Sequence, residues 1–326
     1  METIPLHAPL DDTSWTSCRQ PQVLVLGHFD GIHTGHAQVI QRALDYGAEH
    51  GLPVGLMTFH PHPKGVFGRS EYHRYVTPPM EKERILSRMG LDRLYVVQFD
   101  MSFAQVSAQK FAEAVCALGV KHVVIGFDYR FGHRGEGTAE MLKDWGNDCF
   151  TVDIVPAHSE DGTKVSSTRI RQCLAQGDIT KANQLLGRPY LIQGEVIHGD
   201  ARGRTIGFPT ANVNPEEPYI IPAIGVYAAK VKVGGTWYDG VLSIGLKPTF
   251  KSGETVPTIE AHLFDFDADI YGETIAIAVM DYIRSEQKFN SIQDLIAQIT
   301  ADAEEARQRL AAMDAESMFS CAAQER

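Results

Sequence analysis

The chain has 326 residues, of which 44% are hydrophobic and 22% are charged, the balance of an ordinary globular protein. At roughly 150 residues per domain this length favours two domains, and the composition excludes a mainly disordered, collagen-like or low-complexity protein. With 30 lysines and arginines against 41 aspartates and glutamates, the formal net charge is −11, which disfavours nucleic acid and anionic lipid as partners.

Cysteine content and hydropathy predict where the protein works. The cysteines are odd in number and form no CxxC pair, so we expect neither a disulfide framework nor a zinc knuckle. The same pattern favours a reducing compartment. They lie at positions 18, 116, 149, 173 and 321. No apolar run approaches the roughly 18 residues of a membrane span, and the first residues lack the apolar region of a signal peptide. We therefore expect a soluble, cytoplasmic protein with no membrane partner.

The first half of the chain alternates short apolar runs with helical patterns. Strands are predicted at 22–26, 54–59, 94–97, 123–125 and 150–155. Helices are predicted from the glycine-rich turn after the first strand to about residue 50, and near 79–89, 108–118 and 136–146. This alternation predicts an α/β fold, a Rossmann-like parallel sheet with helices on both faces. Such sheets bind ligands at the C-terminal ends of their strands.

The second half is rich in β-strand patterns. Strands are predicted at 190–197, 225–233, 237–244, 258–264 and 273–284. The pair Gly234-Gly235 separates two of these runs, which indicates a hairpin. Short strands without intervening helices predict a small antiparallel β-barrel.

A terminal helix is predicted after the barrel. Ser291 is placed to cap it, and the apolar stripe that begins at Ile292 and ends at Ile299 predicts that one face packs on the core. Two short helices, at 167–176 and 179–186, close the first domain. The predicted domains are therefore 1–187 and 188–326, without a flexible linker between them.

The turn after the first strand reads GHFDGIHTGH, from Gly27 to His36. A strand, a glycine turn and a helix start direct backbone N–H groups and the helix dipole at one point. Gly35 would let a phosphate approach the backbone, and His33 and His36 can each donate a hydrogen bond to it. The pattern favours displacement at an α-phosphate by alignment and charge neutralisation. Two histidines also suit a metal pair or a plain surface, but no third ligand has zinc-like spacing.

The common phosphate-binding motifs are absent, because the chain contains neither GxxxxGK[ST] nor GxGxxG. Two other segments fall at strand ends or helix starts of the first domain, GFDYRFG at 126–132 and SSTRIR at 166–171. A serine and threonine cluster at a helix start is ordinarily an N-cap, and with arginine one turn later it can also bind an anion. The loop FHPHP at 59–63 suggests no chemistry by itself.

A glycine-rich basic loop at 199–207 leads into the sequence FPTAN in the second half. Two arginines among flexible glycines suit a polyphosphate, although such a loop is also an ordinary hairpin tip. Thr210 and Asn212 offer the neutral oxygens that Mg²⁺ binds together with phosphate and water.

The segment TIEAHLF at 258–264 alternates apolar and polar residues. If the apolar positions face the core, Glu260 and His262 lie on the opposite face of the sheet. A carboxylate there could accept a hydroxyl proton during phosphoryl transfer, although an acidic residue on a solvated strand is commonly structural.

Together these motifs resemble the bifunctional riboflavin kinase/FMN adenylyltransferases of bacteria, also called prokaryotic FAD synthetases. The matching stretches follow the family's order from about residue 22 to past 280: GHFDGIHTGH, TFHPHP, VIGFDYRFG, VSSTRIR, LLGRPY, GRTIGFPTANV, GVYAAKV, IGLKPTF and IEAHLFDFDADIYG. The resemblance implies that the barrel phosphorylates riboflavin with ATP to give FMN. It also implies that the N-terminal domain transfers AMP from a second ATP to FMN, giving FAD and pyrophosphate.

The resemblance implies roles for particular residues. In the N-terminal domain, His33 and His36 would be catalytic and hold the ATP phosphates. The other residues expected to bind ATP or phosphate there are Gly27, Phe29, Asp30, Gly35, Asp128, Ser167, Thr168 and Arg171. In the barrel, Glu260 would be the base on the ribityl 5′-hydroxyl, and Thr210 and Asn212 would bind Mg²⁺. The residues expected to bind ATP or phosphate in the kinase are Gly199, Arg202, Gly203, Arg204, Gly207, Pro209, Thr210 and Asn212.

Three residues depart from the family pattern. His28 stands where the family usually has Asn, Ser243 where Asn often precedes Ile-Gly, and Lys247 where Arg commonly precedes Pro-Thr. Three other functions stay open: a member with one working site, a non-catalytic flavin-binding regulator and a nucleic-acid-binding barrel. The retained Glu260 and histidine pair favour the two-site enzyme, and the negative charge disfavours the last alternative.

Overall fold

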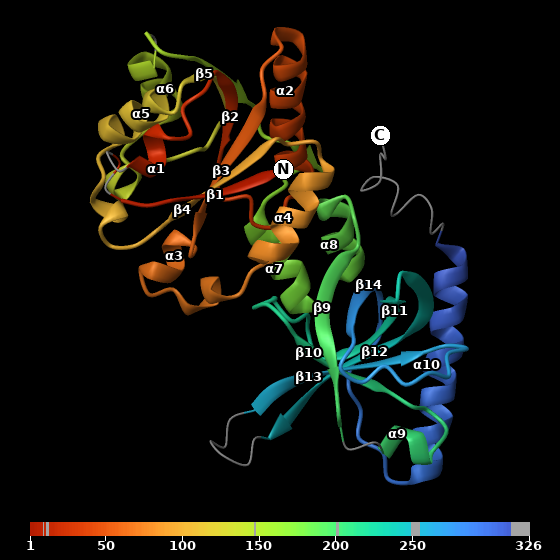
Figure 1. Ribbon diagram of the computed structural model, residues 1–326. Helices are drawn as coiled ribbons and strands as arrows, with labels where there is room; N and C mark the ends of the chain where they lie inside the picture. Colours follow the sequence, from red (N-terminus) through yellow and green to blue (C-terminus); the bar gives the residue numbers. More distant parts are fainter. Residues whose placement is uncertain (9, 11–12, 147, 200–201, 249–254, 314–326) are drawn as a thin grey trace. The chain divides into compact units, whose positions relative to one another are not determined.

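The chain folds as two compact units, Met1–Ser167 and Thr168–Arg326 (Figure 1). The computed structural model describes the chain except for residues 9, 11–12, 147, 200–201, 249–254 and 314–326. The division falls at the start of helix α7 (Ser167–Gln176), whereas the sequence places the domain boundary between 187 and 188. Helix α8 (Ile179–Leu186) groups with the second unit because it packs on two strands of the barrel. The bounds of the two functional domains stay a prediction.

The first unit contains a parallel sheet, as the sequence predicts, with six strands in place of the five expected. In chain order its strands are β1 (Glu2–Leu6), β2 (Gln22–Leu26), β3 (Val54–His60), β4 (Arg93–Gln98), β5 (Val120–Gly126) and β6 (Thr151–Val155). They are arranged in the order β1-β4-β3-β2-β5-β6, so β2 lies between β3 and β5 in the interior of the sheet. The short edge strand β1 is not predicted from the sequence.

Helices cover both faces of this sheet. They are α1 (Thr13–Thr16), α2 (Thr34–His50), α3 (Pro63–Val66), α4 (Pro79–Arg88), α5 (Ala108–Ala117) and α6 (Ala139–Gly146). Three 3₁₀ turns and a small hairpin complete the unit: η1 (Ser70–His73), η2 (Phe103–Gln105), η3 (His133–Gly135), and β7 (Ser159–Glu160) with β8 (Thr163–Lys164). Alternate residues of β2 enter the two cores, with Leu24 packing on the α5 side and Val25 on the side of α2 and α4.

The second unit is a closed antiparallel barrel with a terminal helix, which confirms the predicted fold class. Its strands are β9 (Tyr190–Ile197), β10 (Ala211–Pro215), β11 (Gly225–Val233), β12 (Thr236–Pro248), β13 (Thr255–Leu263) and β14 (Thr274–Arg284). The short helix α9 (Arg202–Thr205) precedes β10, and α10 (Ile292–Ala312) follows β14. The predicted hairpin is present, since Val233 pairs with Thr236 across Gly234 and Gly235, which both have positive φ.

Helix α10 packs on the barrel through its second half (Figure 1). The prediction that its apolar stripe begins in the core is wrong at Ile292, which is 61% exposed. The buried residues lie further along, at Asp302, Ala306 and Leu310.

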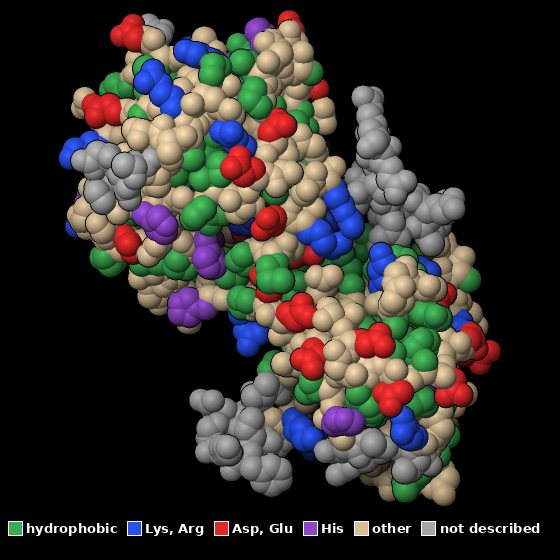
Figure 2. Space-filling view, in the orientation of Figure 1, with side chains coloured by type: hydrophobic (Ala, Val, Ile, Leu, Met, Phe, Trp, Pro, Cys, Tyr) green, Lys and Arg blue, Asp and Glu red, His purple; other side chains and the backbone are tan. Residues whose placement is uncertain are grey.

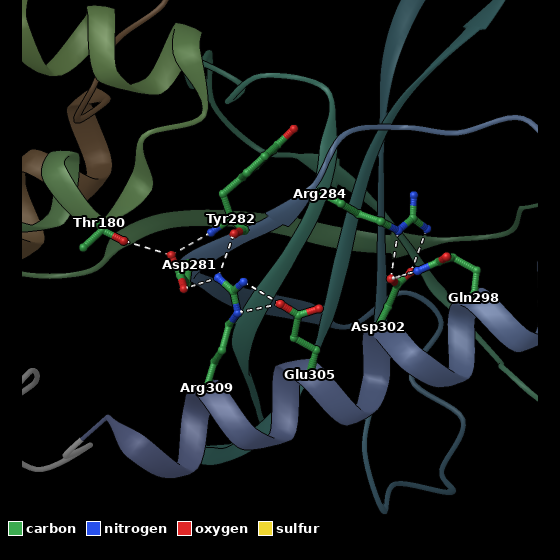
Figure 3. A network of polar contacts seen from close by, with 8 residues as sticks. All are labelled: Thr180, Asp281, Tyr282, Arg284, Gln298, Asp302, Glu305 and Arg309. Atoms are coloured by element: carbon green, nitrogen blue, oxygen red, sulfur yellow. Dashed lines mark hydrogen bonds and ion pairs between the residues drawn. The ribbon is translucent and has the colours of Figure 1, made fainter.

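Ion pairs hold that second half in place (Figure 3). The carboxylate of Asp302 accepts hydrogen bonds from Arg284 of β14 at 2.6 and 2.8 Å. Arg309 pairs with Asp281, which also accepts a hydrogen bond from the Thr180 hydroxyl of α8. These pairs fasten α10 and α8 to the same strand.

The expectation of reduced cysteines is wrong for one pair. Cys116 at the end of α5 and Cys149 before β6 are joined in a disulfide. They are 33 residues apart, and only the packing of α5 and α6 beside β6 brings them together, so spacing alone does not indicate the pair. Cys18 and Cys173 are free thiols, and Cys321 lies outside the described residues.

Two candidate active sites

Two stacked imidazoles lie at the N-terminus of α2, directly after the loop that follows β2. His33 is the N-cap of this 17-residue helix, and its Nδ1 accepts the backbone N–H of His36 at 3.2 Å. The two rings stack with their centroids 3.6 Å apart. Because Nδ1 of His33 is an acceptor, its proton lies on Nε2, the atom able to donate to a phosphate. The predicted histidine pair is thus assembled where the helix dipole favours an anion.

The loop that leads to these histidines has an unusual backbone. Phe29 and Ile32 adopt left-handed φ values of 49° and 41°, which cost energy for residues with a side chain. The Phe29 ring lies 4.9 Å from that of His36. A Cβ at Gly27 would come within 2.8 Å of the Phe29 ring, so only glycine fits there without a shift. The loop shape therefore depends on Gly27.

Asp30 holds the loop through its carboxylate. It is 3% exposed, and Oδ1 accepts the backbone N–H groups of Val76 at 2.9 Å and Thr77 at 3.1 Å. Its own carbonyl accepts a hydrogen bond from the Ser167 hydroxyl at 2.7 Å. Asp30 therefore joins three segments of the first unit and shapes the loop. A direct contact between Asp30 and phosphate stays a prediction.

Asp128 lies in the segment after β5, beside the loop that follows β2 because β5 and β2 are paired. Its carboxylate forms an ion pair with Lys164 of β8. The Lys164 ammonium also lies 4.6 Å from the centroid of the Phe127 ring. Ser167 contacts the loop, whereas Thr168 and Arg171 belong to the second unit, so their approach to the phosphate stays a prediction.

A group of histidines, to which the sequence analysis assigns no function, adjoins the loop after β2. The rings of His28 and His62 stack with centroids 5.0 Å apart, and the Phe59 ring lies 5.4 Å from that of His28. Burial, with nearby His62 and Lys82, lowers the pKa of His28 to about 3, so its imidazole is neutral at pH 7. Figure 2 shows histidine side chains gathered on the face over α3. The repeated His-Pro pattern is the sequence signal for His60 and His62, whereas His28 belongs to the GHFDGIHTGH stretch.

In the barrel, Thr210 and Glu260 come together. Strand β10 pairs with β13 so that Asn212 lies opposite Glu260, and the Thr210 hydroxyl donates to the Glu260 carboxylate at 3.2 Å. The predicted alternation is confirmed, because Ile259 and Ala261 are buried whereas Glu260 is only half-buried. The carboxylate thus lies on the face away from the core, next to a residue that could hold a metal.

Close backbone packing shapes the segment that carries Thr210. His262 Nδ1 lies 2.7 Å from the carbonyl oxygen of Pro209, to which it donates. A Cβ at Gly199 would lie 2.2 Å from the Asn212 amide nitrogen, and one at Gly203 would lie 2.2 Å from the carbonyl oxygen of residue 208. Close packing therefore requires glycine at these two positions. The sequence pattern alone does not show whether these glycines serve loop flexibility or close packing.

A cavity of about 580 Å³ opens beside Thr210, the hydrogen-bond partner of Glu260. It is lined by Val196, Arg204, Pro209, Thr210, Ala211, Ala261, Leu263 and the segment 266–271. A cavity of this size suits a nucleotide. The loop expected to be flexible contains the helical turn α9, which carries Arg202 to Arg204, and Gly207 follows with φ of 88°. The segment 266–271 is a part of the site that residue-level reasoning missed, although it lies within a motif of the family.

The donor set at Thr210 and Asn212 is compatible with Mg²⁺. Among the described residues no cluster of three or more His, Cys, Asp or Glu side chains could hold a metal ion. A Mg²⁺ held by hydroxyl, amide, phosphate and water oxygens needs no such cluster, and Glu260 adds a carboxylate nearby. The residues therefore fit a metal that arrives with a nucleotide.

Comparison with known proteins assigns both units. The family model described as FAD synthetase matches residues 16–169, and the one described as riboflavin kinase matches residues 186–310. Three relatives named bifunctional riboflavin kinase/FMN adenylyltransferase come from Listeria monocytogenes, Bacillus subtilis and Escherichia coli. They are 42%, 45% and 39% identical, covering 94%, 87% and 88% of this chain and 98%, 91% and 92% of their own lengths.

A solved structure has the same fold. It is titled as a macrolide-efflux protein from Streptococcus pneumoniae, is 38% identical, covers 94% of this chain and 99% of its own, and gives a TM-score of 0.86. Within the described part of this chain, no helix combines the length and hydrophobicity needed to traverse a bilayer. The chain belongs to the bifunctional riboflavin kinase/FMN adenylyltransferase family, with FMN adenylyltransferase in its N-terminal part and riboflavin kinase in its C-terminal part.

Proposed function

We propose that the two sites described above carry the two reactions, each with its own ATP. The observation that supports this most strongly for the kinase is the contact between Thr210 and Glu260 at the edge of the 580 Å³ cavity. Glu260 accepts the proton of the ribityl 5′-hydroxyl as that oxygen takes the γ-phosphoryl group of ATP, leaving FMN and ADP. Thr210 and Asn212 would hold Mg²⁺, which would supply neutralisation of the charge on the ATP phosphates.

In the adenylyltransferase, the FMN phosphate attacks the α-phosphorus of ATP and pyrophosphate leaves. His33 and His36 donate hydrogen bonds to the phosphates at the N-terminus of α2, where backbone N–H groups and the helix dipole add to the stabilisation. Thr168 and Arg171 bind phosphate from the start of α7. No protein nucleophile is needed, because alignment and charge neutralisation supply the catalysis.

We place the adenylyltransferase in residues 1–187 and the kinase in residues 188–326, in the cytoplasm, with riboflavin, FMN and ATP as the binding partners. The cytoplasmic assignment rests on the consumption of ATP in both steps. The negative net charge of −11 supports the absence of nucleic-acid and membrane partners.

The test is a product assay with riboflavin and excess MgATP, in which the flavins are separated by chromatography. FAD is expected, and its formation must stop when EDTA removes Mg²⁺. FMN alone would overturn the assignment of the N-terminal site, whereas unchanged riboflavin would overturn that of the kinase.

A further inference from the structure

Helix α4 buries a lysine against the loop after β2, residues 27–33. The Lys82 side chain is 7% exposed, and its ammonium donates to the carbonyl oxygen of His28 at 2.8 Å and to the Thr58 hydroxyl at 3.4 Å. Among the described residues no carboxylate lies within 4.0 Å of this ammonium. A buried charge without a counter-ion is costly, so its position calls for a function.

The groups around Lys82 compensate its charge only in part, through the Asp30 carboxylate, which favours the charged form without pairing directly with it. The groups that face it are His28 and Asp30 of the loop after β2, Thr58 and His60 of β3, Tyr75 before α4, Glu83 of α4 and Thr3 of β1. The Asp30 carboxylate already accepts two backbone N–H groups, and Glu83 accepts the Thr3 hydroxyl at 2.7 Å. The remaining wall of the adjacent cavity of about 380 Å³ is apolar, from residues such as Leu94 and Val96.

The contact made by Lys82 controls the backbone that presents the histidine pair. The His28 carbonyl, which also accepts the Thr58 hydroxyl at 2.8 Å, immediately precedes Phe29 with its left-handed φ of 49°. Asp30 anchors the other side of Phe29. The Phe29 ring in turn contacts His36. The backbone at Phe29 is thus held on both sides, by Lys82 through the His28 carbonyl and by the Asp30 carboxylate.

We propose that Lys82 is a positioning residue for adenylyl transfer, whose buried ammonium holds the loop after β2 and is fully charge-compensated only when the ATP triphosphate binds. This inference rests on the assignment of adenylyl transfer to the N-terminal site. Burial lowers the pKa of Lys82 to about 8, so the charge is lost just above neutral pH in the free protein. Bound ATP favours the charged form, which makes ATP binding weaker at alkaline pH.

The test uses the full-length chain and measures kcat/KM for ATP in FMN adenylylation between pH 7 and 10. In the wild type, kcat/KM should fall up to tenfold per pH unit above about pH 8. Lys82→Met should lower kcat/KM at least tenfold at pH 7.5 and remove this decline. Lys82→Arg, whose charge persists to higher pH, should exceed Lys82→Met at pH 9.5. The control Lys110→Met changes an exposed lysine on α5 and should keep the wild-type profile.

Riboflavin phosphorylation by the same variants reports on the barrel and should not change. A Lys82→Met variant with the wild-type profile, or a wild-type profile that stays flat to pH 10 while FAD is formed, overturns the inference alone. A wild type that makes no FAD from FMN overturns the adenylyltransferase assignment together with it. If Lys82→Met fails to fold, the wild-type decline and the behaviour of Lys82→Arg decide.

Discussion

The hydroxyl of Thr210 lies 3.2 Å from a carboxylate oxygen of Glu260, although 50 residues separate the two along the chain. The pairing of β10 with β13 produces this contact, since Asn212 lies opposite Glu260 in the register. A candidate base and a candidate metal ligand therefore share one end of a strand pair, as phosphoryl transfer between a hydroxyl and MgATP requires.

Replacing Glu260 by Gln should stop FMN formation and leave FMN adenylylation nearly unchanged. General-base catalysis contributes about 10²- to 10⁴-fold, so the kinase kcat should fall by about that factor. Riboflavin phosphorylation and FMN adenylylation are measured separately with MgATP. Glu304→Gln, at an exposed position of α10, is the matched control and should keep both activities. Equal loss of both activities in Glu260→Gln would contradict the two-site arrangement.

His36→Ala should have the opposite effect, because it removes one of the two stacked imidazoles at the start of α2. Adenylylation should fall by about 10²-fold or more, a size typical of losing one preorganised donor to a developing charge. Riboflavin incubated with MgATP would then accumulate as FMN. His50→Ala at the other end of the helix is the control. Continued FAD synthesis by His36→Ala at the wild-type rate would argue against the histidine pair.

Gly199→Ala should impair the kinase through packing. The added Cβ would lie 2.2 Å from the Asn212 amide nitrogen, so Asn212 or the loop must move. Because Asn212 is a proposed ligand of MgATP, the KM for MgATP should rise about tenfold or more in riboflavin phosphorylation, which corresponds to about 1.4 kcal/mol. Steady-state kinetics with varied MgATP measure the effect. An unchanged KM would show that Asn212 does not depend on this close approach.

The stability of the first unit should fall in mild acid because of His28. Its folded-state pKa of about 3 lies below the ordinary value of 6.5, so below pH 6.5 the unfolded chain takes up a proton that the folded chain refuses. The free energy of unfolding should therefore decrease as pH falls from 6.5 towards 3, by at most about 1.4 kcal/mol per pH unit. His28→Asn should reduce this slope.

Urea denaturation at pH 5 and pH 7, followed by hydrogen exchange in peptides of the first unit, measures the slope. The same comparison at the barrel peptides serves as an internal control, since His28 does not belong to that unit. Identical slopes in the wild type and in His28→Asn would show that the His28 imidazole titrates normally.

The sequence predicts much of this fold because local signals and tertiary packing agree. Helix α8 was predicted at its observed bounds, where Asp178 caps the start and Gly187 adopts a left-handed conformation at the end. The edge strand β1 was missed, since five residues that contain a proline carry little strand signal. Lys82 was missed for another reason: it lies in the charged sequence PMEKER, which resembles a solvated helix face.

The sequence predicts which residues belong to the candidate sites, but only part of the contacts that these residues make. Glu260 and Thr210 were placed by their motifs, but their hydrogen bond depends on the register of β10, a strand that the sequence did not indicate. The disulfide between Cys116 and Cys149 likewise depends on how α5 and α6 pack beside β6, which no spacing rule contains.

The two units differ in how their sheets end. The barrel joins β10 to β9 and so has no edge strand, whereas the parallel sheet ends at β1 and β6. An unpaired edge is a template for pairing with another chain, and proline weakens such a template because it lacks an N–H donor. Pro5 lies within β1. Pro5 therefore removes one N–H donor from the open edge of β1, which disfavours the pairing of this edge with a strand of another chain.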